Sequence, residues 1–265
     1  MSQHKETTGH TLLVAFVLCI VCSVVVAGAA VALKPAQTSN KQLDRQKNIL
    51  SAAGLLDGPM SKADIEAQFS RFEARLVDLD SGNYVSETDN GVQPEDFDQK
   101  KASKDPGQSI DLDGDTDIAG IGRRENLAQV YILKDGVNVS KIVLPIRGYG
   151  LWSTLWGYLV LEGDGNTVAG LAYYDQQETP GLGGEVDNPA WKAQWPGKRV
   201  FNDAGAVAIH LKKGGVDPAS QDAQYQVDAL SGATLTSKGV DYMLQFWLGE
   251  NGFGPYLQKV RGGQA

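Results

Sequence analysis

The sequence predicts an α+β fold, an antiparallel sheet with helices, preceded by one N-terminal transmembrane helix. Three observations support it: an uncharged apolar run near the N-terminus, two successive hairpin patterns in the middle of the chain, and amphipathic helical spacing near its end. They divide the 265 residues into a transmembrane anchor (1–33), a region of stalk helices and an acidic loop (34–126), and a folded domain (127–265).

The anchor is predicted over residues 11–33, which contain no charged side chain. As an α-helix this run is roughly 35 Å long, enough to cross the hydrocarbon core of a bilayer. A cleaved signal peptide is the alternative, because Ala27-Gly28-Ala29 and Ala30-Val31-Ala32 resemble small-residue cleavage sites. The run is longer than the apolar part of a signal peptide, which favours the anchor.

The charges that flank this run conflict with export of the large domain. Lys5 precedes the run, whereas Lys34, Lys41, Arg45 and Lys47 follow it. The positive-inside rule would therefore leave the domain in the cytoplasm, although large domains can be translocated regardless of flanking charge.

Two helices are predicted in the region after the anchor. The first covers residues 37–53 and ends at Gly54. The second begins at Ser61, where Asp64 completes a capping-box-like pattern, and carries Ile65, Phe69 and Phe72.

Residues 80–122 are acidic, glycine-rich and poor in large apolar side chains, which predicts a long surface loop with little core. Residues 111–117 resemble a calcium loop. However, Thr116 stands where such a loop needs glycine, and Gly122 where it needs a bidentate glutamate. These two departures argue against calcium.

The folded domain begins with alternating apolar residues. A hairpin is predicted over residues 130–146 with its turn at Lys134-Asp135-Gly136, and a second joins residues 156–162 to 167–174. Short helices are predicted over 188–195 and 236–248, the latter with Val240, Met243, Leu244 and Trp247 at helical spacing.

Composition excludes several classes of function. The formal net charge is -8, which argues against a nucleic-acid partner. Cys19 and Cys22 lie in the apolar run and His210 is the sole histidine of the domain, so no zinc, iron–sulfur or haem ligand set is expected. His210 lies in a predicted strand, residues 206–211. Redox chemistry would therefore need an organic cofactor.

Two glycine-bearing segments are the candidate site. Residues 178–185 follow a predicted strand, and their three glycines either form a turn or let a ligand approach the backbone. Residues 228–237 open the last helix, where a free N-terminus favours a phosphate. The same hydroxyls also suit a helix N-cap at Ser231, Thr234 or Thr236, and the pattern alone leaves both interpretations open.

The second segment, Asp228-x-x-Ser231-Gly232-Ala233-Thr234, resembles the flavinylation motif of the FMN-binding domain family. With residues 144–154, residues 178–188 and the single apolar span, the chain resembles the C subunits of Na+-translocating NADH:quinone reductases. This resemblance covers the whole chain and implies that residues 127–265 are an FMN-binding domain.

The resemblance implies that Thr234 carries FMN in a covalent phosphoester bond. The other cofactor-binding residues that we expect are Asp228, Ser231, Gly232, Ala233, Glu178, Thr179, Leu182, Gly183, Trp152, Ser153 and Thr154. No metal ligand and no essential acid or base is expected, because the flavin only relays electrons. Arg147 is considered for stabilising reduced flavin, and equally for a surface or phosphate-pairing role.

The resemblance also implies the setting of the protein. It would be one of the six subunits of a bacterial inner-membrane complex that oxidises NADH, reduces ubiquinone and exports sodium. A flavin transferase would mature it on the periplasmic side. Two alternatives remain: the G-type subunit of the related Rnf complex, and an anchored extracytoplasmic binding module without redox function.

Overall fold

The computed structural model describes residues 8–56, 58–86 and 91–264. Lys5, the basic residue that precedes the apolar run, lies outside the described residues. By contacts the chain forms two units, residues 1–44 and 45–265.

The first unit consists of most of α1 (Thr8–Ala52), a single helix that contains Pro35. The sequence predicts two segments here, whereas the structure continues one helix through the proline. A proline inside a helix removes one backbone hydrogen bond, and the turns on either side keep theirs. The apolar run is fully exposed, and α1 is the one described helix that is long and apolar enough to cross a membrane.

The second unit is built on a six-stranded antiparallel sheet with the order β2-β1-β5-β6-β7-β8. Its strands are β1 (Phe72–Asp78), β2 (Tyr84–Val85), β5 (Leu127–Asp135), β6 (Asn138–Tyr149), β7 (Thr154–Glu162) and β8 (Val168–Asp175). Both predicted hairpins are present, as β5–β6 and β7–β8. The predicted α+β fold is confirmed.

The remaining elements surround this sheet. Two small sheets pair β3 (Ser109–Asp111) with β4 (Arg123–Glu125), and β9 (His210–Lys212) with β10 (Gln226–Asp228). The helices of the second unit are α2 (Lys62–Phe69), η1 (Pro94–Asp96), α4 (Gln99–Ala102), η2 (Gly183–Asp187), α5 (Pro189–Lys192), η3 (Gln221–Tyr225), α6 (Thr234–Leu248) and α7 (Gly254–Arg261).

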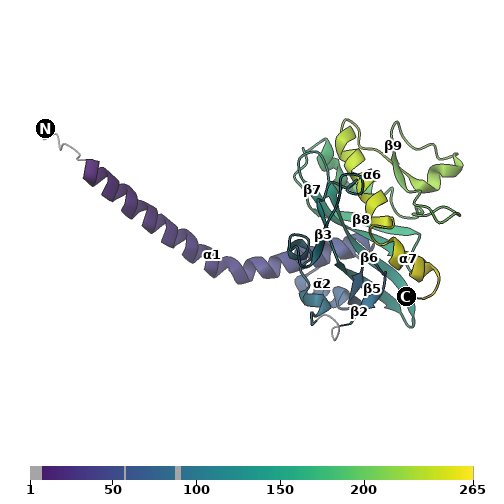
Figure 1. Ribbon diagram of the computed structural model, residues 1–265, viewed down its shortest axis with the longest axis horizontal. Coiled ribbons are helices and arrows are strands. Elements are labelled where there is room, and N and C mark those ends of the chain that lie inside the picture. Colours follow the sequence, from purple (N-terminus) through teal and green to yellow (C-terminus); the bar gives the residue numbers. More distant parts are fainter. Residues whose placement is uncertain (1–7, 57, 87–90, 265) are drawn as a thin grey trace. The chain divides into compact units, whose positions relative to one another are not determined.

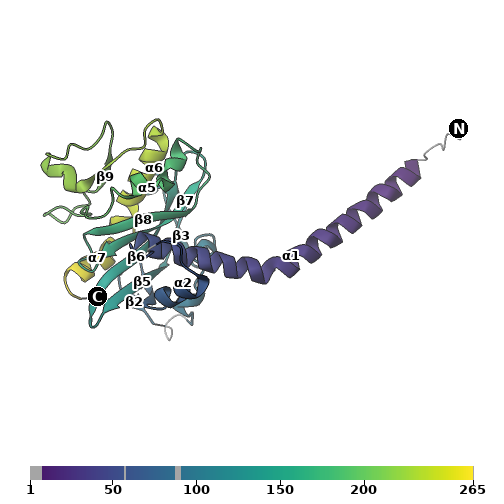
Figure 2. The same cartoon turned by 180° about the vertical axis from the view of Figure 1, so that it is seen from behind.

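Helices cover both faces of the large sheet. Figure 1 shows α6 and α7 in front of it, and Figure 2, from behind, shows the last turns of α1 in front of the other face. Ile49 and Leu50 in these turns are fully buried. On the first face the predicted stripe of α6, Val240, Met243, Leu244 and Trp247, is buried in the main core.

Helix α6 approaches β6 closely, and glycines make this possible. A Cβ on Gly239 would lie 2.2 Å from the Tyr149 carbonyl oxygen, and one on Gly148 would lie 2.7 Å from the Met243 Cβ. The Trp247 indole also donates to the Arg147 carbonyl at 2.6 Å. These contacts hold the middle and last turns of α6 against the C-terminal end of β6.

Several predicted elements need correction. The capping box at Ser61 and Asp64 is present, but α2 ends at Phe69 and Phe72 begins β1. The predicted helix over 188–195 is reduced to α5, and the predicted strand over 206–211 to β9. Residues 80–122 contribute more core than expected, because Phe97 and Ala102 pack on Leu76 and Ala119 joins the main core.

Candidate functional site

The two glycine-bearing segments that the sequence singles out lie against each other. A Cβ on Gly232 would lie 3.1 Å from a Leu182 methyl group, and one on Gly183 would lie 2.5 Å from the Thr236 hydroxyl. Gly232 has φ +74°, which glycine adopts without strain. The segments therefore meet at the N-terminal end of α6.

Glu178 connects these two segments to a third. Its Oε1 accepts hydrogen bonds from the backbone N–H groups of Leu151, Trp152 and Ser153 at 3.0, 2.9 and 3.3 Å. Its Oε2 accepts from the Thr236 hydroxyl at 2.7 Å. Both carboxylate oxygens are thus engaged within the fold, and their four hydrogen bonds connect the three segments.

The environment of Glu178 favours its charged form. Burial raises the pKa of this carboxyl, but hydrogen bonds from the Thr236 hydroxyl and the three backbone N–H groups outweigh burial and hold the pKa below its ordinary value. Glu178 is therefore an anion at neutral pH.

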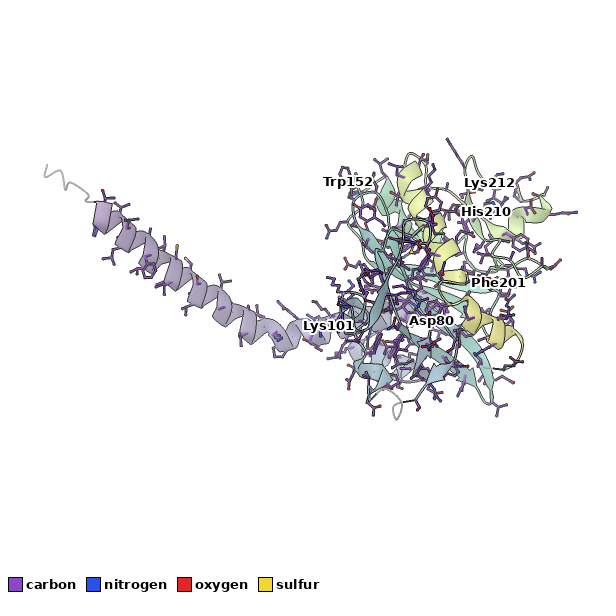
Figure 3. The ribbon with its side chains drawn as sticks, in the orientation of Figure 1. Asp80, Lys101, Trp152, Phe201, His210 and Lys212 are labelled. Carbon is purple, nitrogen blue, oxygen red and sulfur yellow. The ribbon has the colours of Figure 1, made fainter. Side chains whose placement is uncertain are left out.

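The third segment, residues 151–154, carries an exposed aromatic ring. Trp152 is 65% exposed and projects from the edge of the domain, as Figure 3 shows. The Ser153 hydroxyl accepts from the Gln177 N–H at 2.8 Å, and Thr154 begins β7 beside it. Within this segment, a ligand ring can therefore stack on the exposed side chain of Trp152.

Thr234 is the first residue of α6 and is exposed. The N-cap is Ala233, which has no side-chain capping bond, so the structure places the cap at none of Ser231, Thr234 or Thr236. Nearby hydroxyls are engaged: Thr236 binds Glu178, and the Ser237 Oγ accepts from the Leu230 N–H at 2.9 Å.

The first turn of α6 therefore has the properties of an anion site. Its N–H groups point along the positive end of the helix dipole, and no side chain caps them. Sequence reasoning missed two neighbours. Leu235 is 56% exposed beside Thr234, and Thr236 is the partner of Glu178. The sequence around Thr236 suggested only a helix cap and did not indicate a hydrogen bond to Glu178, which is distant in the sequence.

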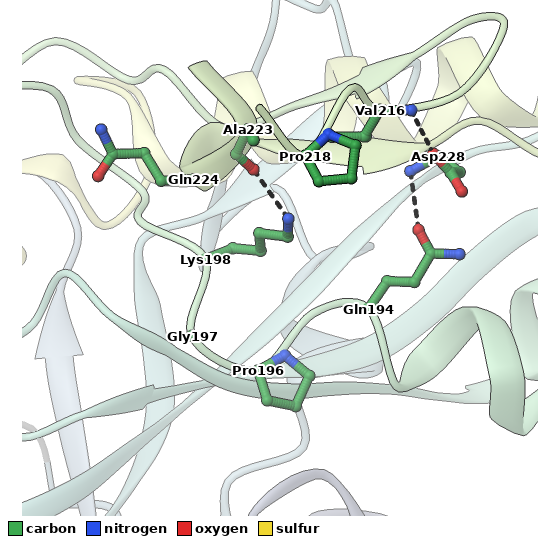
Figure 4. A pocket seen from close by; sticks show the side chains of 9 residues that line it. All are labelled: Gln194, Pro196, Gly197, Lys198, Val216, Pro218, Ala223, Gln224 and Asp228. Atoms are coloured by element: carbon green, nitrogen blue, oxygen red, sulfur yellow. Dashed lines mark hydrogen bonds between the residues drawn. The ribbon is translucent and has the colours of Figure 1, made fainter. Parts of the chain in front are cut away.

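Asp228 makes hydrogen bonds to other parts of the fold. Its Oδ1 accepts from the Val216 N–H at 2.7 Å, and its own N–H donates to the Gln194 Oε1 at 3.1 Å. With Lys198 and others it lines a pocket of about 550 Å³, shown in Figure 4. Its carboxylate orders the loop before β10.

Arg147 is a core residue and not a surface or phosphate-pairing one. It is 4% exposed, its Nη2 lies 2.6 Å from the Glu125 Oε2, and its guanidinium lies over the Trp156 and Trp247 rings. Two buried charges, one on β6 of the large sheet and one on β4 of a small sheet, neutralise each other here.

The remaining polar candidates are also engaged within the fold. His210 is half-buried with its Nδ1 2.8 Å from the Ala208 carbonyl. In the acidic loop Asp113 and Asp117 accept from backbone N–H groups, and Asp111 pairs with Arg123. Among the described residues no three His, Cys, Asp or Glu side chains are grouped to hold a metal ion.

Comparison with known proteins points to one family. A family model described as FMN-binding domain matches residues 150–249. The C subunit of the Na(+)-translocating NADH-quinone reductase of Pseudomonas aeruginosa is 52% identical over 263 residues, covering 99% of each chain. Its counterpart from Yersinia pestis is 49% identical, covering 98% of this chain and 96% of that protein.

Solved structures agree with the sequence relatives. The crystal structure of Shewanella oneidensis NqrC matches with a TM-score of 0.74 and 36% identity, over 84% of this chain and 99% of that one. The crystal structure of the C subunit from Parabacteroides distasonis matches with a TM-score of 0.64 and 29% identity, over 85% and 96%.

Proposed function

Because the chain belongs to the family formed by the C subunits of Na(+)-translocating NADH-quinone reductases, we propose that it is the membrane-anchored flavin subunit of such an enzyme. FMN is joined to Thr234 by a phosphoester bond. The flavin supplies electron transfer between other redox centres of the complex during NADH oxidation, ubiquinone reduction and sodium export.

The proposal rests on two features that occur together at the start of α6, an exposed hydroxyl and a helix end without a side-chain cap. Thr234 offers an exposed hydroxyl, and the helix end beside it has no side-chain cap. The positive end of a helix dipole and its free N–H groups stabilise a phosphate there. Thr236 and Ser237, in contrast, use their hydroxyls inside the protein.

Exposed apolar side chains around Thr234 suit the isoalloxazine ring. Leu182 and Leu235 are exposed, as is Trp152 on the segment tied through Glu178. Thr179 lies beside Leu182 on the exposed side of the same loop. These residues bind and orient the ring, while Gly183 and Gly232 allow the two loops to approach each other.

The same family membership supports a proposed setting for the flavin. Helix α1 anchors the protein in the inner membrane, and residues 45–265 lie on the periplasmic side, where a flavin transferase attaches FMN. The complex has six subunits, and the others supply the sodium pathway, because the apolar run of this chain contains no charged residue.

The proposal is tested by Thr234→Ala, produced in cells that contain the flavin transferase. We expect the protein to fold and to lose the flavin fluorescence that remains on a denaturing gel, because the acceptor oxygen is gone. Ser51→Ala is the matched control, since it removes an exposed hydroxyl from the last turns of α1, outside the candidate site. Fluorescent Thr234→Ala protein would place the bond elsewhere.

A further inference from the structure

The carboxylate of Glu178 is buried, and no cation from the described part of the chain neutralises it. The residue is 5% exposed, and its four hydrogen-bond donors are three backbone N–H groups and one hydroxyl. Among the described residues, no Lys, Arg or His side chain lies within 4.0 Å of it. Its negative charge is therefore stabilised by dipoles and still acts on its surroundings.

This charge lies close to three parts of the proposed flavin site: the start of α6, the segment with Trp152 and the glycine loop. Its partner Thr236 is the third residue of α6, two residues after Thr234 and on the buried side of the same first turn. Its other donors include the N–H of Trp152. A Cβ on Gly183 would lie 2.6 Å from its Oε2, so the glycine loop also passes directly beside it.

We propose that Glu178 is a positioning residue that also lowers the reduction potential of the flavin. The proposal rests on the function proposed above, with FMN on Thr234. As a positioning residue, Glu178 holds together the three segments that contact the flavin. As a buried anion, it disfavours the addition of further negative charge to the ring beside it.

The sign of the effect follows from charge balance. Reduction of the ring by two electrons with uptake of one proton adds one negative charge to it. A fixed anion in a protein environment of low polarity repels that charge, so the reduced form is destabilised and the potential falls. The positive end of α6 acts in the opposite direction on the phosphate and the ring.

Glu178→Gln separates charge from geometry. The Gln Oε1 can accept the same three backbone bonds, and its amide can donate to the Thr236 hydroxyl, which then acts as acceptor. We expect flavin to stay attached and its midpoint potential to become more positive. At a given reference potential the ratio of reduced to oxidised flavin should rise about tenfold. For a two-electron couple this corresponds to about 30 mV.

The measurement is a spectroelectrochemical titration of the purified full-length flavoprotein. Glu250→Gln is the matched control, because it removes the same charge from an exposed residue beyond the other end of α6. The control should leave the potential unchanged. An unchanged potential in flavin-loaded Glu178→Gln protein would overturn the proposal.

Thr236→Val provides a second test that does not depend on the stability of Glu178→Gln. It keeps the carboxylate but removes one donor, so the pKa of Glu178 should rise. As the pH is lowered, protonation of Glu178 removes its charge and should raise the flavin potential. In Thr236→Val we expect this rise to begin at a higher pH than in the wild type. Superimposable curves would overturn the proposal.

The two proposals fail in different ways. If the wild-type protein from its native cells carries no covalent flavin, the proposed function is wrong before any variant is made. If the wild type and Glu178→Gln are both flavinylated and share one potential, only the role of Glu178 is wrong.

Discussion

Gly183 is the residue at which the candidate site is most tightly packed. A Cβ there would lie 2.5 Å from the Thr236 hydroxyl and 2.6 Å from the Glu178 Oε2. The extra carbon would push apart the carboxylate and its hydroxyl donor.

We therefore expect Gly183→Ala to lower the free energy of unfolding by about 1–3 kcal/mol, as overpacking does in tight cores. Denaturant unfolding of the two proteins measures the difference. Gly114→Ala is the control, since nothing lies within 4 Å of its added Cβ. Equal stability of both variants would mean that the loop moves freely away from α6.

Single residues of the site were predictable where a local motif contains them. The local pattern singled out the two glycine-bearing segments, because phosphate binding at a helix start needs small residues close together in sequence. The choice of Thr234 within them came from the resemblance to the flavinylation motif and stays a prediction. The roles of Glu178 and Arg147 were not predictable. Their partners lie 25 to 58 residues away for Glu178 and 22 residues away for Arg147, and no local pattern encodes such a pair.

At the scale of the elements, an ion pair connects β6 to β4. Arg147 on β6 and Glu125 on β4 are both buried, and Gln99 of α4 also donates to Glu125. Removing one member leaves the other charge buried and unpaired, which is costly.

We expect Arg147→Met to cost about 3–5 kcal/mol of unfolding free energy. Lys134→Met on β5 is the comparison, because Lys134 and its partner Glu73 both have side chains well exposed to solvent, and such pairs contribute at most about 1 kcal/mol. Thermal unfolding with circular dichroism distinguishes the two. Similar losses in both variants would show that the buried pair has no special weight.

The hairpins were predicted correctly because apolar alternation and a glycine turn are local signals. Strand β1 was missed for a physical reason. Phe72 stands three residues after Phe69, so it continues the helical spacing of α2. The change to a strand happens over Ser70 and Arg71, without a proline or glycine to mark it, and pairing with β5 decides it.

At the scale of the whole molecule, the flanking charges and the family imply opposite orientations. Four basic residues follow the apolar run of α1, which by the positive-inside rule keeps the domain in the cytoplasm. The proposed function instead requires residues 45–265 to lie in the periplasm.

Protease added to spheroplasts decides the orientation. We expect residues 45–265 to be digested while a cytoplasmic marker protein stays intact. Digestion that requires broken cells would show that the charge rule holds for this chain.

The four donors to the Glu178 carboxylate come from residues 151–153 and from Thr236, which are distant in sequence. If one segment opens, the buried carboxylate loses hydrogen-bond donors, which costs free energy. The three segments that Glu178 connects therefore stabilise one another. These segments should therefore open as one cooperative unit. In native-state hydrogen exchange, the amides of Leu151 and Trp152 should exchange together with the hydrogen-bonded amide of Ser237 in α6 rather than as an independent loop.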